Sequence, residues 1–425
     1  MRKTGHRATS IVLFMLCLMY LITYVDRVNV STAALSFREE LHLSNIQYGW
    51  IFSAFAYSYA LFQIVGGWIG DRYGPRLVLG LCGLIWAAAT LGTGLAGGFW
   101  SMIFARVMLG LGEGATFPTS TSAMSRWTRK GWRGFAQGIT HSFSRFGNAV
   151  TPPLVAALII AWGWRGSFYV LGAASLCWVV VWVWYFRDDP RKHADISEAE
   201  LAVLPPETSR IDKTPVPWAR LVPRMMPTTI VYFCYGWTLW LYLSWLPQFF
   251  QQGHHLNLQS SAAFSGGVFL GGVIGDTLGG VVSDRVYKLT GDLAKARRNV
   301  IMGSLLGSLV FLLPVFFVDN IVVLSLCLAA AFLCLELTIG PIWSVPMDIA
   351  PQHAGTASGI MNTGSAVAAI VSPTVFGYVV DLSGSWQLPF AGSIVLLLIG
   401  AALTFLMRPD RSIEPAPAGA ATLRA

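Results

Sequence analysis

Residues 134–153 read GFAQGITHSFSRFGNAVTPP, and residues 355–374 read GTASGIMNTGSAVAAIVSPT. The two stretches align without a gap and are identical at seven of 20 positions. A shorter repeat precedes each of them, because GGWIGDR at 66–72 returns as GGVVSDR at 279–285. Repeats in the same order along a chain indicate two related halves.

The composition is that of a membrane protein. Of the 425 residues, 54% are hydrophobic and 12% are charged, whereas a soluble domain carries about 25% charged residues. The six cysteines lie in apolar stretches without a CxxC motif, so they predict neither disulfides nor a metal site. No motif predicts an enzyme active site or a bound cofactor. These features exclude a soluble enzyme.

Apolar segments divide the chain into about twelve predicted transmembrane helices. A spanning helix needs about 20 mostly apolar residues, and breaks rich in charge, proline or glycine separate segments near that length. The predicted spans are 11–35, 48–70, 77–97, 99–124, 135–160, 166–186, 226–251, 261–286, 299–318, 321–347, 355–380 and 388–408.

The basic residues predict an orientation. If the N-terminus is cytoplasmic, 24 of the 29 Lys and Arg residues fall in cytoplasmic segments, and only Arg38 and Arg165 lie outside. This asymmetry follows the positive-inside rule and places both termini in the cytoplasm. It also explains the net charge of +8 without a nucleic-acid partner.

The longest polar stretch separates six spans from six. An even number of spans between the repeats gives both halves the same orientation, so the predicted fold is an all-α membrane protein. Its twelve transmembrane helices form two pseudo-symmetric six-helix bundles around a midplane cavity, as in alternating-access carriers.

Ser197 and Glu200 have capping-box spacing and predict a short helix between the halves. The predicted parts are an N-terminal bundle at 1–187, a cytoplasmic linker at 188–225, a C-terminal bundle at 226–408 and a disordered cytoplasmic tail at 409–425.

Several local motifs stand within and beside these spans. They are Gly67 to Arg76 in a loop, Tyr24-x-Asp26-Arg27-x-Asn29, Arg106 with Gly112-Glu113-Gly114 and Phe117-Pro118, Trp245-Leu246-Pro247, and Gly359 with Asn362. Together they resemble the major facilitator superfamily and, within it, the anion:cation symporters. The resemblance implies the major facilitator fold and proton-coupled movement of small carboxylates, such as sugar acids, tartrate-like acids and aromatic acids.

Seven ionisable side chains fall inside the predicted spans. A charged side chain at the bilayer centre costs at least about 2.5 kcal/mol, so each one is a functional candidate. They are Asp26, Arg27, Arg106, Glu113, Arg145, Asp276 and Glu336.

Four of these residues, together with Tyr24, are the principal candidates. Arg27 shares a side of its helix with Tyr24 and can bind a carboxylate with two hydrogen bonds, so we predict that both contact the substrate. Asp26 and Glu113 are the predicted proton carriers, and Arg106 is predicted to hold the deprotonated Glu113. A permanent structural ion pair is the alternative for each.

Arg145 lies near the middle of the fifth span. Its counterpart in the second half is Ala366, so no symmetric structural requirement explains the arginine. It predicts a second contact for a dicarboxylate or for an aromatic acid with another acidic group. Alternatively, it neutralises Asp26 or Glu113.

The remaining candidates have weaker signals. His141 and Asn362 occupy equivalent positions of the repeat and are predicted to bond the substrate. Asp276 is a candidate for the cytoplasmic gate, and Glu336 is a secondary proton candidate with no evident partner. Further predicted substrate contacts, for which lipid or core packing is the alternative, are Tyr59, Tyr235, Trp343 and Ser344. The predicted gate residues, which would latch the halves together, are Asp71, Arg72, Asp284 and Arg285.

These features predict a secondary transporter that couples proton entry to uptake of a small organic carboxylate. It would work as a monomer in the bacterial inner membrane, with the proton gradient and no cofactor as its energy source. Its expected partners are the organic anion, protons and the lipid bilayer. Two other classes stay open: an exchanger or exporter of the same anions that protons do not drive, and a membrane sensor that binds without transport.

Overall fold

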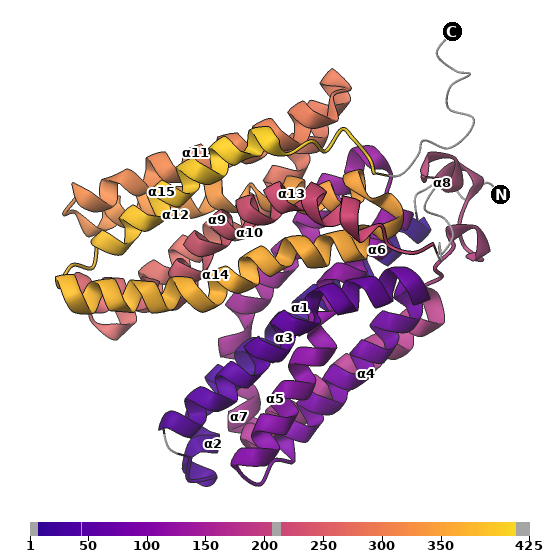
Figure 1. The fold of residues 1–425 in the computed structure, drawn as a ribbon. Helices are drawn as coiled ribbons and strands as arrows, with labels where there is room; N and C mark the ends of the chain where they lie inside the picture. The colour runs from indigo at the N-terminus through magenta and orange to yellow at the C-terminus, as the bar shows by residue number, and fades with distance from the viewer. Residues whose placement is uncertain (1–6, 44, 206–213, 414–425) are drawn as a thin grey trace.

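The described residues cross the molecule in twelve helical passes. Figure 1 shows how these helices are arranged. The computed structural model describes residues 7–43, 45–205 and 214–413, and these residues form helices and no β-strand. Eight helices are long and apolar enough to span a membrane, and one of them, Lys130–Tyr185, has the length of two passes. The predicted fold class, an all-α membrane protein with two six-helix bundles, is confirmed.

The N-terminal bundle consists of the first six passes. The last two form one long helix with a break at Gly163, where a φ of 70° suits glycine. This break separates the predicted spans 135–160 and 166–186. The helices are α1 (Arg7–Thr32), α2 (Ala34–Glu40), α3 (Asn45–Tyr73), α4 (Pro75–Gly94), α5 (Phe99–Gly114), α6 (Thr116–Trp127) and α7 (Arg133–Tyr185).

The C-terminal bundle consists of the other six passes. Its first helix begins at Trp218, inside the stretch predicted as linker, because Leu221 and Met225 are buried there in the protein core. The helices are α9 (Trp218–Gln248), α10 (Leu258–Thr290), α11 (Val300–Leu312), α12 (Ile321–Glu336), α13 (Ile339–Ile349), α14 (Ala354–Ser383) and α15 (Leu388–Leu403).

The fourth pass of each bundle is broken into two helices. In the N-terminal bundle α5 gives way to α6, and in the C-terminal bundle α12 gives way to α13. An acidic residue stands just before each break: Glu113 is in the last turn of α5, and Glu336 is the last residue of α12. The two acids therefore occupy equivalent places in the two halves.

The halves meet where α3 packs against α14 and where α7 packs against α10. The repeated stretches supply these contacts, since 134–153 lies in α7 and 355–374 lies in α14. Glycines permit the close approach: a Cβ atom on Gly134 would lie 2.8 Å from the Gly280 carbonyl oxygen, and one on Gly355 would lie 2.7 Å from that of Gly67. From these contacts the two bundles diverge toward the opposite end of the molecule (Figure 1).

A short helix, α8 (Glu198–Val203), lies between the bundles in sequence, and we call the end of the molecule where it lies the linker end (Figure 1). The predicted capping box is confirmed, because the Ser197 hydroxyl accepts from the Glu200 amide and the Glu200 carboxylate accepts from the Ser197 amide. Glu200 Oε1 also accepts from the Thr9 amide at 3.0 Å, which ties α8 to α1. Part of the predicted linker, 206–213, and residues 414–425 of the predicted tail lie outside the described residues.

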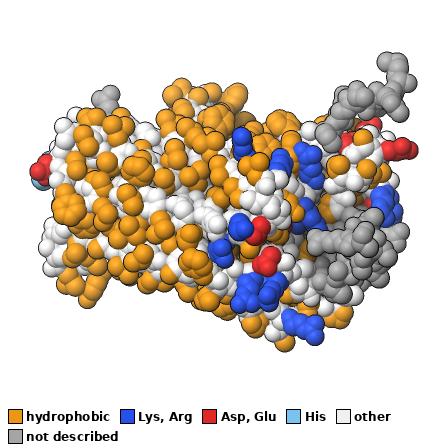
Figure 2. All heavy atoms as spheres, turned by 90° about the horizontal axis from the view of Figure 1, so that it is seen from above, with side chains coloured by type: hydrophobic (Ala, Val, Ile, Leu, Met, Phe, Trp, Pro, Cys, Tyr) orange, Lys and Arg blue, Asp and Glu red, His pale blue; other side chains and the backbone are white. Residues whose placement is uncertain are grey.

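The surface agrees with membrane insertion. Figure 2 shows a face covered largely by hydrophobic side chains, with most of the Lys and Arg side chains gathered toward the linker end. A surface of this kind is stable in lipid, where apolar side chains face the hydrocarbon.

Candidate functional site

Arg27 and Glu113 form a buried ion pair inside the N-terminal bundle. The Arg27 Nε atom on α1 lies 2.6 Å from Glu113 Oε2 on α5. The Glu113 side chain is 0% exposed, whereas that of Arg27 is 16% exposed. The sequence singled out both residues but predicted Arg106 as the partner of Glu113. In the structure Arg106 lies within electrostatic range of Glu113, and the hydrogen bond comes from Arg27.

Aromatic rings surround the Arg27 guanidinium. Its Cζ atom is 4.5 Å from the ring centroid of Tyr59 and 4.9 Å from that of Tyr24. The rings of Phe55 and Phe117 lie at 5.3 and 5.2 Å. Ring faces stabilise a cation without neutralising it. Within the described part of the chain, Arg27 Nη2 is buried and has no hydrogen-bond acceptor, so the guanidinium retains capacity for a second anion.

Asp26 faces away from this pair toward α7. It is buried, and Ser175 donates a hydrogen bond of 3.3 Å to Asp26 Oδ2. Asp26 Oδ1 has no hydrogen-bond partner among the described residues. The adjacent residues Asp26 and Arg27 thus have different partners, as their spacing on a helix predicts.

A second charged cluster joins the two halves. Arg145 of α7 donates to both Glu336 oxygens, at 3.1 and 3.0 Å, and its Nε lies 3.6 Å from Asp276 Oδ2 on α10. The hydroxyl of Tyr235 on α9 donates to Glu336 Oε2 at 2.8 Å. This geometry supplies the partner that the sequence did not reveal for Glu336. It also places Asp276 beside Arg145, and not in the cytoplasmic gate predicted for it.

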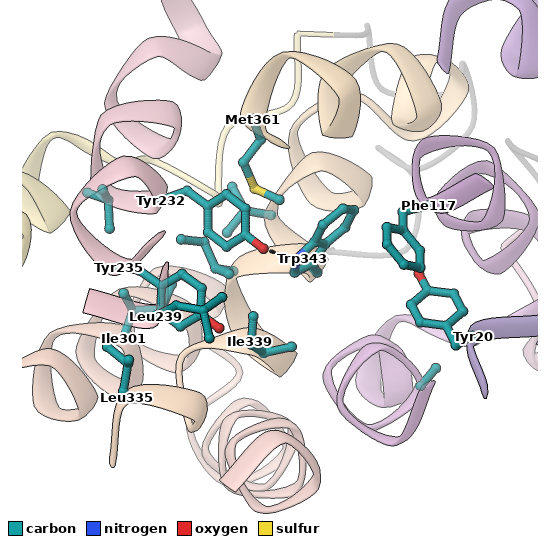
Figure 3. Packing of buried hydrophobic residues seen from close by; sticks show 14 of the residues in the cluster. Tyr20, Phe117, Tyr232, Tyr235, Leu239, Ile301, Leu335, Ile339, Trp343 and Met361 are labelled. Carbon is teal, nitrogen blue, oxygen red and sulfur yellow. Dashed lines mark hydrogen bonds between the residues drawn. The ribbon is translucent and has the colours of Figure 1, made fainter. Parts of the chain in front are cut away.

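A chain of aromatic rings lies between the two charged clusters. The ring centroid of Phe117 lies 6.3 Å from that of Trp343 (Figure 3). Phe117 also lies beside Arg27, and the ring of His141 lies 5.0 Å from that of Trp343. Trp343 Nε1 donates to the Tyr232 hydroxyl at 2.9 Å, and Tyr232 stacks on Tyr235 at 5.2 Å. The predicted residues His141, Tyr235 and Trp343 therefore come together at the contact between the halves.

Two other predicted contacts have different surroundings. Asn362 of α14 donates to Gln63 Oε1 of α3 at 2.8 Å, so it bonds across the halves. Ser344 is fully buried and donates to the Gly340 carbonyl of its own helix at 2.8 Å. The sequence did not single out Gln63, although an amide in an apolar helix is a detectable signal.

At the linker end, one aspartate of each half caps a helix of the other half. Asp71 accepts from the backbone amides of Gly355 and Thr356 at 2.9 and 2.6 Å. Asp284 accepts from the amides of Gly134 and Phe135 at 3.2 and 2.8 Å. Anionic groups at helix N-termini are favourable. The other two predicted gate residues, Arg72 and Arg285, are exposed at the surface.

Asp348 adds a third connection that sequence reasoning missed. Its Oδ1 accepts from Arg133 of α7 at 2.9 Å, and its Oδ2 accepts from Arg297 at 3.0 Å. Arg297 also donates to Asp284 at 3.0 Å, so the connection joins the latch. An aspartate at the end of an apolar span, with no basic residue near it in sequence, was the available signal.

The comparisons with known proteins agree with this architecture. The model of the Major Facilitator Superfamily matches residues 16–373, with a second match at 296–424. A probable sulfoacetate transporter of Cupriavidus necator is 46% identical over 415 residues, which cover 97% of this chain and 96% of the relative. A hexuronate transporter of Bacillus subtilis is 30% identical over 413 residues, 96% of each chain. The solved structure of the transporter FucP in an outward conformation shares the fold, with a TM-score of 0.71, 14% identity and coverage of 95% of this chain and 100% of that one.

Two of these findings are decisive: the family model spans most of the chain, and relatives match it along nearly their whole length. The chain is therefore a multi-pass membrane transporter, not an enzyme, and it belongs to the major facilitator superfamily.

Proposed function

We propose that this transporter takes up a small organic anion together with protons. The anion would carry a carboxylate or a sulfonate, which agrees with the relatives that are named as transporters of sulfoacetate and of hexuronates. The observation that carries the proposal is the ion pair between Arg27 and the fully buried Glu113. We further propose that the protein works as a monomer in a bacterial inner membrane, without a cofactor.

The pair couples the two ligands through competition for one cation. When a substrate anion binds the partly exposed Arg27, Glu113 loses its hydrogen bond and its counter-charge. An ionised carboxylate left unpaired in a buried site is strongly unfavourable, so Glu113 takes up a proton. Conversely, protonation of Glu113 frees Arg27 for the anion. Each ligand therefore binds well only when the other is present, and Asp26 is a further proton acceptor within electrostatic range.

The contacts between the halves support a starting conformation for this proposed cycle. The bonds made by Asp71, Asp284 and Asp348 close the linker end. If the linker end is cytoplasmic, as the basic residues predict, this conformation faces outward and loads from outside. Release would require these bonds to break while the opposite ends of the bundles approach, as in rocking of two bundles around a fixed site.

Proteoliposome uptake under an imposed pH gradient tests the proposal. Glu113→Gln should lose gradient-driven accumulation of sulfoacetate or a sugar acid but keep exchange of internal for external substrate, since a permanently neutral side chain cannot release a proton. Glu198→Gln, on the exposed surface of α8, is the matched control and should accumulate normally. Full accumulation by Glu113→Gln would refute the coupling role. Wild-type uptake that needs an opposing substrate but no pH gradient would identify an exchanger.

A further inference from the structure

We propose that Arg145, Glu336 and Asp276 form a second anion–proton exchange site, so that the transporter binds substrates with two acidic groups together with two protons. The proposal rests on the proposed function, because it assigns to this cluster the exchange already assigned to Arg27 and Glu113.

The two sites are related by the repeat. Glu113 and Glu336 stand at equivalent breaks in the fourth pass of their bundles. Each acid is bonded by an arginine, and a tyrosine of the first pass of the bundle contacts each ion pair: Tyr24 lies beside Arg27, and Tyr235 donates to Glu336. The two sites differ in which half of the protein supplies the arginine. Arg27 comes from the same half as its acid, whereas Arg145 crosses from the N-terminal half.

The second site has one cation for two acids. Asp276 and Glu336 are both 0% exposed. Gly275 lets α12 approach closely, because a Cβ atom there would lie 2.9 Å from Glu336 Cβ. Within the described residues, neither Asp276 oxygen has a hydrogen-bond partner, whereas Glu336 accepts from Arg145 and Tyr235. Two adjacent buried carboxyl groups facing one guanidinium cannot both ionise favourably, so Asp276 holds a proton and Glu336 is the ionised partner.

No other charge in the described surroundings changes this balance. On α7, His141 donates its Nδ1 hydrogen to the Gln137 carbonyl at 2.9 Å, and Ser142 bonds to Thr277 of α10 at 2.6 Å. The tyrosines that face the cluster are Tyr24 from α1 and Tyr232 and Tyr235 from α9.

In both sites the arginine is the more exposed member of the ion pair. The Arg145 side chain is 7% exposed and that of Arg27 is 16% exposed, while the acids bonded to them are sealed. Both guanidinium groups also lie near Tyr24: Arg27 Cζ is 4.9 Å from its ring centroid, and Arg145 is within its electrostatic range. A diacid long enough to span the two guanidinium groups would place one acidic group on each.

The exchange predicts a proton count. In the free protein Glu113 and Glu336 are ionised and Asp276 is protonated. A diacid bound to both arginines displaces both glutamates, and each glutamate takes one proton from solution. A substrate with a single acidic group displaces one glutamate and brings one proton.

Calorimetric titration of the purified full-length protein, repeated in buffers of different ionisation enthalpy, counts these protons. The diacid probes are sulfoacetate, tartrate and phthalate, and the single-acid probes are gluconate and benzoate. We expect two protons per bound diacid and one per bound monoacid. The triple variant Arg145→Gln/Asp276→Asn/Glu336→Gln, which leaves no unpaired charge, should bring one proton with either class and should lose its preference for diacids. Ser142→Ala removes an uncharged bond between the halves and should still bring two protons with a diacid.

The outcomes separate this proposal from the proposed function. Four outcomes would each overturn the second site and leave proton coupling at Glu113 standing. In the wild type they are uptake of one proton with a diacid, uptake of two protons with a monoacid, and binding of monoacids alone. In the triple variant the outcome is uptake of two protons with a diacid. No proton uptake with any probe would overturn the proposed function itself. The wild-type counts decide the matter even if the triple variant does not fold.

Discussion

Two latches hold the linker end closed: Asp71 on the amides of Gly355 and Thr356, and Asp284 on those of Gly134 and Phe135. Replacing Asp71 by asparagine should weaken the closure at both. Asp71 uses two oxygens to accept three hydrogen bonds from α14, at 2.9 Å from the Gly355 amide, 2.6 Å from the Thr356 amide and 2.7 Å from the Thr356 hydroxyl. Asparagine has one acceptor oxygen, and its NH₂ group would face a donor. The variant also loses the negative charge at the N-terminus of α14.

The expected magnitude follows from these bonds. A hydrogen bond to a charged group contributes about 1.5–3 kcal/mol, and the variant loses at least one. A loss of about 2 kcal/mol raises the population of the state with an open linker end roughly 30-fold.

Hydrogen–deuterium exchange of the backbone amides measures this population. The informative amides are those of Gly134 and Phe135, because Asp284 holds them and the substitution does not touch them. We expect their exchange to accelerate by about the same factor as in the α14 segment, since one rocking motion opens both latches. Asp188→Asn is the matched control: it weakens a cap on the Arg76 amide within the N-terminal half and should act only locally. Unchanged exchange at Gly134 and Phe135 in Asp71→Asn would show that the two latches open independently and would refute this reasoning.

Three further changes have defined outcomes. Arg27→Lys should weaken anion binding at least about tenfold in calorimetry, because an ammonium cannot form the two parallel hydrogen bonds of a guanidinium packed among aromatic rings. Unaltered affinity would exclude Arg27 as the residue that binds the anion. Gly359→Ala should lower thermal stability by the equivalent of about 1–3 kcal/mol, because its Cβ would lie 2.6 Å from the Gln63 carbonyl oxygen. Gly303 has open space around it, so Gly303→Ala should leave thermal stability unchanged. Equal effects of the two substitutions would refute the close contact. Burial raises the pKa of Glu200, but hydrogen bonds from Thr9 and Ser197 lower it more, so its pKa lies below the ordinary 4.5. Its stabilising contribution is therefore present at neutral pH and is lost as the pH falls through the lowered pKa. Between pH 6 and pH 3, the Glu200→Gln variant should lose less thermal stability than the wild type. An equal loss would contradict this.

The sequence was sufficient for the fold and for the identity of the charged residues. Long apolar segments and the repeat at 134–153 predict the two bundles, because hydrophobic length and periodicity are local properties. The intramembrane charges were identified for the same reason: Arg27, Glu113 and Arg145 stand out in apolar surroundings.

The pairing of those charges could not be predicted, because it depends on which helices pack together. Arg145 and Glu336 are far apart in sequence and belong to different bundles, and only the contact of α7 with the C-terminal half joins them. The sequence offered Arg106, or alternatively Arg145, as the partner of Glu113, whereas the structure places the Arg27 side chain on it. Asp348 was missed because its partners, Arg133 and Arg297, read as basic residues of cytoplasmic loops.

An experimental structure with a bound anion tests anion–proton exchange at Arg27 most directly. The anion would be the one that most stabilises the purified protein among the five probes named above. We expect its acidic group on the Arg27 guanidinium, with the 2.6 Å bond between Arg27 and Glu113 broken. An anion bound elsewhere, with that bond intact, would contradict the exchange.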